Sequence, residues 1–411
     1  MQGSVEVGDR SRARKMVGRA FLAQNVAVGA AFGGFGVSVL PLQQAYGTTT
    51  AMAALALSLC VLVLGLVSPA VGTLIGRIGL RWTMIAGVVI SGIGYALLAV
   101  APNMGTVLLL YALPLGVGLA MFGPFPSRVL ASNWYPHNPG PALGIANMPL
   151  LVALLPMVGL VVIRDHGLAT FYLVLAALHL ALIPFLLGIS DRPVQAEPLA
   201  GGHGHGAAAP GMLPTRALLA SPAFWMMALG AGFLNAVGIT SVSHLAAVVA
   251  ERGVAPSEGA GLLAIMGGSA VLGSLAVGFL CGKLGAARTL ALIAAALALS
   301  WFALLGSDAF GLMAICALVL GAGGAGVFPA VNMLSAGLFG QLSLPRVIGL
   351  FGMVTLPLTF GVPPVVGLLR DAVGRYGPAI GLLIAGCVAA AVIFLVTGRS
   401  RPQLAPTVVP A

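Results

Sequence analysis

Eight polar side chains lie in or at the ends of stretches that are otherwise apolar, and they are the groups best able to bind a small molecule. An amide offers both donors and an acceptor, a guanidinium offers donors with a fixed charge, and a neutral imidazole offers one donor and one acceptor. Such groups suit a carboxylate or a hydroxyl held without covalent chemistry. They are Gln24, Asn25, Arg128, Asn147, Asn235, His244, Asn332 and Thr355.

Patterns for catalysis or metal binding are much weaker. All nine Asp and Glu residues fall between the apolar stretches, so no buried acid–base pair is predicted. His203 and His205 stand two apart in a Gly-rich stretch without a Cys or carboxylate pair beside them, and a solvated spacer explains them better than half a metal site. The four cysteines lie in apolar stretches and are predicted to be small core residues. We therefore expect no enzyme activity, no metal and no cofactor.

The composition indicates that lipid is the main solvent of this chain. Of its 411 residues, 59% are hydrophobic and 7% are charged, whereas a soluble domain carries about 25% charged residues. Mean hydropathy is +1.08. The net charge of +10 comes from basic residues that are scattered singly, with no aromatic platform beside them, so nucleic acid is not an expected partner.

Twelve apolar segments are long enough to cross a bilayer, which takes roughly 20 residues. The predicted fold is an all-α membrane protein with twelve transmembrane helices in two six-helix bundles. The predicted spans are 20–42, 49–75, 82–100, 104–127, 139–162, 168–188, 221–248, 259–281, 289–306, 309–337, 347–369 and 378–398. The predicted parts are a basic tail (1–19), an N-terminal bundle (20–188), a linker (189–220), a C-terminal bundle (221–398) and a second tail (399–411).

The distribution of Lys and Arg predicts the orientation, because these residues stay preferentially on the cytoplasmic side. With both termini, the linker and the tails in the cytoplasm, 15 of the 19 basic residues lie inside. The outer loops keep only Arg164, Arg252, Arg370 and Arg375.

The two halves of the chain repeat one another at an offset of 205 or 206 residues. The segment 72–79 recurs as 278–285, and Arg164-Asp165 recurs as Arg370-Asp371. Two similar six-span bundles meet near a pseudo-twofold axis, where a cavity can open alternately to either side. This organisation is typical of transport.

The loops after the second and eighth spans resemble the signature of the major facilitator superfamily, and the likeness covers essentially the whole chain. The matching residues are Gly72, Arg77, Gly79 and Arg81, and again Gly278, Lys283, Gly285 and Arg288. The resemblance implies that these loops help to hold one closed state from the cytoplasmic side. The acidic residue of the signature is replaced by Gly76 in the first copy and Gly282 in the second.

Within the superfamily, the chain is most similar to the monocarboxylate and oxalate:formate exchanger group. The supporting segments are 133–136, 142–146, His244-Leu245 with 251–253, and 339–376 with its Pro363-Pro364 pair. Relatives in this group often carry a basic residue in spans 8 and 11 that meets a carboxylate. Here the corresponding stretches, 273–275 and 355–359, are uncharged.

The resemblance also implies that spans 1, 4, 7 and 10 face a central cavity with 2, 5, 8 and 11 beside them, which is why the eight polar residues are candidates for substrate binding. For each amide the alternative is a hydrogen bond between helices. Arg128, at the predicted end of span 4, either attracts an anion or anchors the cytoplasmic end. His244 either titrates or donates to substrate, or it bonds a neighbouring helix, and His179 is predicted to be structural.

The resulting expectation is a secondary active or facilitative transporter that works by alternating access and moves a small organic anion such as a monocarboxylate. The main alternative is efflux of apolar or drug-like compounds. A sensor without flux would need an output domain, and a membrane-embedded enzyme would need buried acid and base groups. We expect a functional monomer in a cell inner membrane with lipid around it.

Overall fold

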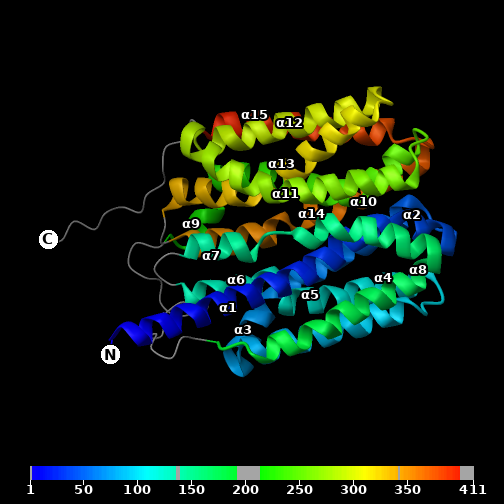
Figure 1. Cartoon of the computed structure of the whole chain (residues 1–411). Helices are drawn as coiled ribbons and strands as arrows, with labels where there is room; N and C mark the ends of the chain where they lie inside the picture. The colour runs from blue at the N-terminus through cyan, green and yellow to red at the C-terminus, as the bar shows by residue number, and fades with distance from the viewer. Residues whose placement is uncertain (1, 136–138, 192–212, 341–342, 399–411) are drawn as a thin grey trace. The chain divides into compact units, whose positions relative to one another are not determined.

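A computed structural model describes residues 2–135, 139–191, 213–340 and 343–398, and all regular secondary structure in these ranges is helical (Figure 1). Most of the predicted linker, with His203 and His205, and the tail from 399 onward lie outside the described residues. Nine helices in the described ranges are long and apolar enough to cross a bilayer, and the bent pair Pro256–Ser274 and Ala276–Leu284 makes a tenth.

Two of these helices are too long for one crossing. Helix α3 (Thr50–Leu98) has 49 residues, which at about 1.5 Å per residue exceeds twice the roughly 30 Å of a bilayer core. It breaks at Gly79, where φ is 83° and ψ is 164°, and helix α8 (Leu150–Leu187) breaks in the same way at Gly167, where φ is 85° and ψ is 166°. Glycine adopts a positive φ without the strain that a Cβ would add. If each broken helix is counted as two segments, the nine helices of the described ranges give eleven segments, and the bent pair adds a twelfth. The number of segments therefore equals the number of predicted spans.

The chain divides into two compact units, Met1–Gly204 with Ala255–Gly267, and His205–Val254 with Gly268–Ala411. The helices of the first unit are α1 (Gln2–Val28), η1 (Gly29–Gly34), α2 (Phe35–Tyr46), α3, α4 (Met104–Leu110), η2 (Tyr111–Leu115), α5 (Gly116–Phe122), α6 (Pro124–Trp134), α7 (Pro139–Ala146) and α8. The elements η1 and η2 are short π-helices. In η2, Pro114 removes a backbone donor, which favours such an irregular turn.

The core of the first unit forms where α3 packs against α5 and α8. Gly87 and Gly118 allow the close approach of α3 and α5, because a Cβ on Gly87 would lie 2.6 Å from the Met121 Cβ. The large side chains of Tyr111, Phe122 and Tyr172 are fully buried there.

The second unit contains α9 (Thr215–Leu219), α10 (Pro222–Ala250), α12 (Ala286–Gly306), α13 (Phe310–Phe339), α14 (Leu344–Val373) and α15 (Gly377–Thr397). Helix α11 (Pro256–Leu284) contributes its residues up to Gly267 to the first unit and the rest to the second. The start of α10 is well determined by sequence, since Ser221 caps the N–H of Phe224 and Pro222 occupies the first turn. Trp301, Phe224 and Phe394 are buried in this unit.

Candidate functional site

The fifth predicted span is interrupted close to its middle, which corrects the expectation of one continuous helix over 139–162. Helix α7 ends at Ala146 and α8 begins at Leu150. Pro149 stands between them with φ −90° and ψ 58°, and it has no N–H to continue the helical ladder. Non-helical backbone at membrane depth is tolerated where it is buried in protein or lines a cavity, and interrupted helices of this kind often mark binding sites in transporters.

Asn25 of α1 supplies the hydrogen bonds that the interruption removes. Its Nδ2 donates to the carbonyl oxygen of Met148 over 2.8 Å and to that of Phe21 over 3.0 Å. Its Oδ1 accepts from the N–H of Leu151 over 3.0 Å. With 3% of its surface exposed, this candidate is fully used in holding the interrupted span to α1.

Glycines allow the first span to lie directly on the interruption. A Cβ on Gly33 would lie 2.9 Å from the Cα of Val152, and a Cβ on Gly29 would meet the Cβ of Leu151. These glycines serve close helix packing, as small residues do in membrane bundles.

Arg128 and Asn147 are brought together at the same interruption. The Nε–H of Arg128 donates to the Oδ1 of Asn147 over 3.3 Å, and the Nδ2 of Asn147 donates to the carbonyl oxygen of Leu143 over 2.7 Å. Arg128 was predicted to lie at the end of span 4 (104–127). In the structure, Gly123 interrupts the helix and Pro124 restarts it, so α6 continues to Trp134. The guanidinium therefore projects from within a helix, half-buried, and not from its end.

Gln24 neighbours Asn25 on α1 and differs from it in one respect. It is also buried, with 6% of its surface exposed, but its Oε1 has no hydrogen-bond partner among the described residues. A buried acceptor left without a donor costs about 1–3 kcal/mol. An amide in that condition is well suited to a ligand that brings its own donor.

The three candidates on α10, α13 and α14 differ in their surroundings. Asn235 on α10 is exposed and Asn332 on α13 is half-buried, and neither has a hydrogen bond among the described residues. Thr355 on α14 is buried, and its hydroxyl donates back to the carbonyl oxygen of Phe351 over 2.9 Å. A Cβ on Gly232 would lie 2.6 Å from the Thr355 Cγ2. Thr355 therefore packs between α10 and α14.

His244 is fully buried between the same two helices. Its Nε2 lies 2.9 Å from the carbonyl oxygen of Pro363, and its Nδ1 lies 3.0 Å from the hydroxyl of Tyr376. By contrast, the one hydrogen bond of His179 to another described residue joins its Nδ1 to the carbonyl oxygen of Leu175 on its own helix, at 2.7 Å. Its ring packs against the rings of Tyr95 and Phe122.

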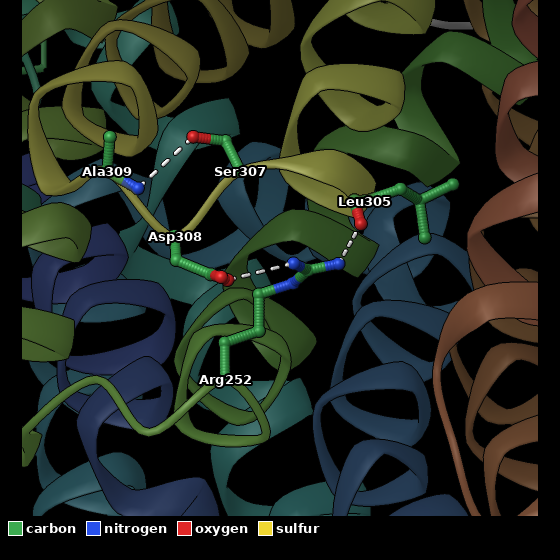
Figure 2. A network of polar contacts seen from close by, with 5 residues as sticks. All are labelled: Arg252, Leu305, Ser307, Asp308 and Ala309. Atoms are coloured by element: carbon green, nitrogen blue, oxygen red, sulfur yellow. Dashed lines mark hydrogen bonds and ion pairs between the residues drawn. The ribbon is translucent and has the colours of Figure 1, made fainter.

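The turn after α10 is held by Arg252 (Figure 2). Its guanidinium donates to the carbonyl oxygen of Leu305 at the end of α12 and lies 3.1 Å from the Asp308 carboxylate. In the connection between α12 and α13, the N–H of Ala309 donates to the hydroxyl of Ser307 over 3.1 Å. Arg252 thus ties the end of α10 to the connection between α12 and α13.

The loop predicted to act in gating is held in the first unit by a residue that the sequence analysis placed in the linker. Asp191 accepts a hydrogen bond from the N–H of Arg81 over 3.2 Å, and the Arg81 Nε–H donates to the carbonyl oxygen of Ile189 over 2.7 Å. Asn133 and Trp134 donate to the carbonyl oxygens of Asp191 and Ser190 over 3.1 and 2.9 Å. The sequence offered one signal that could have identified Asp191, namely its position just beyond the predicted end of span 6 at residue 188.

The other residues of the two loops have fewer contacts. Gly72 faces the Phe125 ring, 3.7 Å from where a Cβ would be. Arg77 and Arg288 are exposed, Lys283 lies 4.4 Å from the centroid of the Phe279 ring, and Gly278 borders open space. Gly285 has φ 83° and ψ 150°, close to the values of Gly79 in the first copy. The internal repeat is therefore matched in backbone conformation at this position.

No group of three His, Cys, Asp or Glu side chains that could hold a metal ion occurs among the residues placed by the structure. His203 and His205 lie outside those residues. The four cysteines are buried and unpaired, as predicted.

Comparison with known proteins agrees with this architecture. Residues 21–355 match the family described as Major Facilitator Superfamily. A bacterial homolog of the human lysosomal transporter Spinster, solved inward-facing and occupied, superposes with a TM-score of 0.77 over 96% of this chain and 98% of its own, at 15% identity. The inward-facing, unoccupied structure gives a TM-score of 0.68 over 95% of each chain, at 16% identity.

A curated relative is the multidrug resistance protein B homolog of Mycobacterium tuberculosis, which is 30% identical over 159 residues in each of two strains. That match covers 37% of this chain and 29% of the relative, so less than a third of the relative's length is spanned. The family match, by contrast, covers most of the chain. The protein belongs to the major facilitator superfamily, whose members are multi-pass membrane transporters.

Proposed function

We propose that the protein is a secondary transporter that works by alternating access and moves a small organic anion, with a monocarboxylate as the first choice. The observation that carries this proposal is the pair formed by Arg128 and Asn147 at the interrupted fifth span. A guanidinium presents its donors as a fork that matches a carboxylate. Charged groups inside membrane helices are costly, and they commonly mark substrate pathways.

Each unit contains further candidates for substrate binding. Gln24 on α1 offers a buried acceptor with no partner among the described residues, which suits a hydroxyl or a protonated carboxyl group. Asn235 and Asn332 carry amides that make no hydrogen bond within the described ranges and are at least partly exposed. Asn25 and Thr355 hold the helices that carry these groups.

Counterflow into liposomes that contain the purified protein tests the proposal. A panel of labelled short-chain carboxylates is offered to the wild type, to Arg128→Gln and to the matched control Arg164→Gln, which removes an exposed charge paired with Asp165. We expect saturable exchange of at least one carboxylate, a loss of about tenfold or more in Arg128→Gln, equivalent to about 1.4 kcal/mol of binding, and no change in the control. Equal exchange by wild type and Arg128→Gln would exclude this role for Arg128.

Efflux of apolar or drug-like compounds is the second candidate. It is favoured by the match to relatives named for multidrug resistance over 37% of the chain. Transport of an uncharged compound does not need a guanidinium, so Arg128→Gln should leave it unchanged. No carboxylate exchange by folded wild-type protein, together with efflux of an uncharged dye, would favour this candidate over the first.

The membrane topology is part of the same proposal. The excess of Lys and Arg in alternate loops supports cytoplasmic termini in a cell inner membrane. Membership of the superfamily supports a functional monomer, in which the loops around Arg77 and Arg81, and around Lys283 and Arg288, stabilise one closed state. Cysteine accessibility from each side of the membrane tests the orientation directly.

A further inference from the structure

Two guanidinium groups from different helices converge at the end of α8 in the first unit. Carbonyl oxygens at the C-terminal end of a helix have no partner within that helix, and positive charge is favourable there. Arg19 of α1 donates to the carbonyl oxygen of Gly188 over 2.5 Å. Arg81 of α3 donates to the next one, that of Ile189, over 2.7 Å. The end of α8 thus brings a cation of span 1 next to a cation of span 3.

The contact with α1 also fixes how that helix is turned about its own axis. The Arg19 guanidinium lies where a side chain of residue 188 would be, because a Cβ on Gly188 would meet it. One turn earlier, the Sδ of Met16 accepts from the backbone N–H of Ser190 over 3.4 Å. With Met16 and Arg19 held by the same short segment, the face of α1 that remains outside is defined.

Three basic residues follow one another along α1 beside this contact. Arg12, Lys15 and Arg19 are spaced by three and four residues, so they lie on one side of the helix. Arg12 and Lys15 are exposed and Arg19 is half-buried, whereas the buried residues of the same turns are Ala13, Met16, Val17 and Ala20. Together with Arg81, these three residues form what we call the basic face.

The basic face lies at the depth of the lipid headgroups. The apolar helix that begins at Ser11 and ends at Tyr46 has 36 residues, which at about 1.5 Å per residue exceeds the roughly 30 Å of a bilayer core. In Figure 1, the N-terminal end of α1 extends beyond the other helices of its unit. Next to Arg81, the Trp82 side chain is 57% exposed, and tryptophan is enriched where hydrocarbon meets headgroups.

The positive charge of the basic face is not balanced by the acidic groups around it. Asp191 is the nearest described carboxylate, and its Oδ1 accepts from the backbone N–H of Arg81 over 3.2 Å. Glu6 and Asp9 precede the basic face on α1. The three ion pairs of the described ranges all involve other arginines. Four cations therefore face one carboxylate at this end of the unit.

We propose that the basic face binds the phosphate group of an anionic phospholipid, which joins span 1 to the adjacent ends of spans 3 and 6. Guanidinium donors match a phosphate in geometry, and each Lys or Arg near an anionic membrane surface adds to the attraction. Binding of the headgroup stabilises the first unit. The proposal does not depend on which cargo the protein moves, so failure of the carboxylate assignment leaves it unaffected.

The test compares dioctanoyl phosphatidylglycerol with dioctanoyl phosphatidylcholine, which has the same phosphate diester but a compensating positive charge. Equilibrium binding to the purified full-length protein in detergent is measured by native mass spectrometry. We expect the wild type to bind phosphatidylglycerol tenfold or more tightly, roughly the effect of two charges. The double variant Arg12→Gln/Lys15→Gln should lose this preference, and each single variant should lose part of it.

The matched control is Arg14→Gln/Arg216→Gln, which changes the net charge equally. Arg14 and Arg216 are exposed, but Arg14 lies on another side of α1 and Arg216 lies on α9. The control should keep the wild-type preference. Equal binding of both lipids by the wild type, or the same preference in Arg12→Gln/Lys15→Gln as in the wild type, would overturn the proposal. An equal loss in the control would also overturn it, since attraction would then be diffuse.

Thermal unfolding gives a second measurement on the same proteins. Phosphatidylglycerol should raise the wild-type midpoint by several degrees relative to phosphatidylcholine, because a ligand that binds the folded state stabilises it. Arg12→Gln/Lys15→Gln replaces two exposed side chains, so its midpoint in phosphatidylcholine should equal that of the wild type and should not rise with phosphatidylglycerol. Inorganic phosphate is the remaining arm. If it raises the wild-type midpoint as much as the lipid does at equal concentration, the site takes a soluble anion and the lipid proposal is wrong.

Discussion

Asn25 accepts a hydrogen bond from the backbone N–H of Leu151, which lies 126 residues further along the chain, over 3.0 Å. The bond replaces the helical partner that Leu151 lacks because Pro149 has ended the preceding turn. The same amide donates to Met148. One side chain of α1 thus satisfies the backbone on both sides of the interruption in the fifth span.

This arrangement predicts that Asn25→Leu is strongly destabilising. The substitution removes three hydrogen bonds and leaves a part-buried N–H and a part-buried carbonyl without their partner, for a total cost of about 2 kcal/mol or more. The thermal midpoint of the purified protein in detergent should fall by several degrees.

Gln24→Leu is the matched substitution, one residue earlier on the same helix. It removes an acceptor that has no partner among the described residues, so stability should change by no more than about 0.5 kcal/mol or should rise. If Gln24 binds cargo, the same variant should nevertheless transport poorly. A larger loss of stability in Gln24→Leu than in Asn25→Leu would contradict this account of the interruption.

Glycine is required at position 79 for two separate reasons, which three variants can separate. At φ 83° any side chain is strained, and a Cβ would meet the Asp191 carboxylate. Gly79→Ala should therefore cost about 1–2 kcal/mol from strain alone, with a further cost from displacing Asp191. Gly285→Ala has the same φ but open space around it, so it should show the strain alone.

Gly76→Ala is the control in the same helix, since Gly76 has a helical backbone and open space where a Cβ would be. It should be neutral or more stable by about 0.5–1 kcal/mol. Denaturant or thermal unfolding of the three variants should give the order Gly76→Ala, Gly285→Ala, Gly79→Ala. Equal stability of Gly79→Ala and Gly76→Ala would mean that Asp191 and the backbone at position 79 can move freely.

Arg252 should contribute to stability mainly through a backbone carbonyl and only slightly through its ion pair (Figure 2). The Asp308 side chain is 82% exposed, and a pair so open to solvent is worth about 0–1 kcal/mol. The bond to Leu305 is part-buried, and a hydrogen bond from a charged donor is worth about 1.5–3 kcal/mol. Asp308→Ala should thus leave the thermal midpoint nearly unchanged, whereas Arg252→Ala should lower it. The reverse order would show that the carboxylate dominates.

The apolar segments of the sequence predicted the fold well because burial in lipid allows few alternatives to a helix. The glycines that end the helices at positions 79 and 285 were visible as a repeat, and the structure confirms their shared backbone conformation. What the sequence did not predict is where a span is interrupted internally. Pro149 and Pro156 both lie in the fifth span, yet the chain breaks at Pro149, where Asn25 supplies the missing partners, and continues through Pro156.

The candidate site could be predicted in part, for a related reason. Residue type selected the amides, Arg128 and His244, but it could not distinguish Asn25, which is fully bonded, from Gln24, whose acceptor lacks a partner. Nor could it associate Asp191 with Arg81, or Tyr376 with His244, because those contacts depend on how helices pack over distances of more than 100 residues.

The pairing of Arg128 with Asn147 leads to a prediction that charge alone would not make. Lysine at position 128 keeps the positive charge but has no Nε–H to donate to the Asn147 Oδ1 and no planar fork for a carboxylate. If the site needs only a cation, Arg128→Lys should exchange carboxylates like the wild type. If it needs the geometry seen here, the apparent affinity should fall by about tenfold or more, since a charge-assisted hydrogen bond is worth about 1.5–3 kcal/mol.

Asn147→Leu should then have a similar effect, and the double variant should be little worse than either single one, because both changes remove the same interaction. Additive losses in the double variant would show that the two residues act on cargo independently.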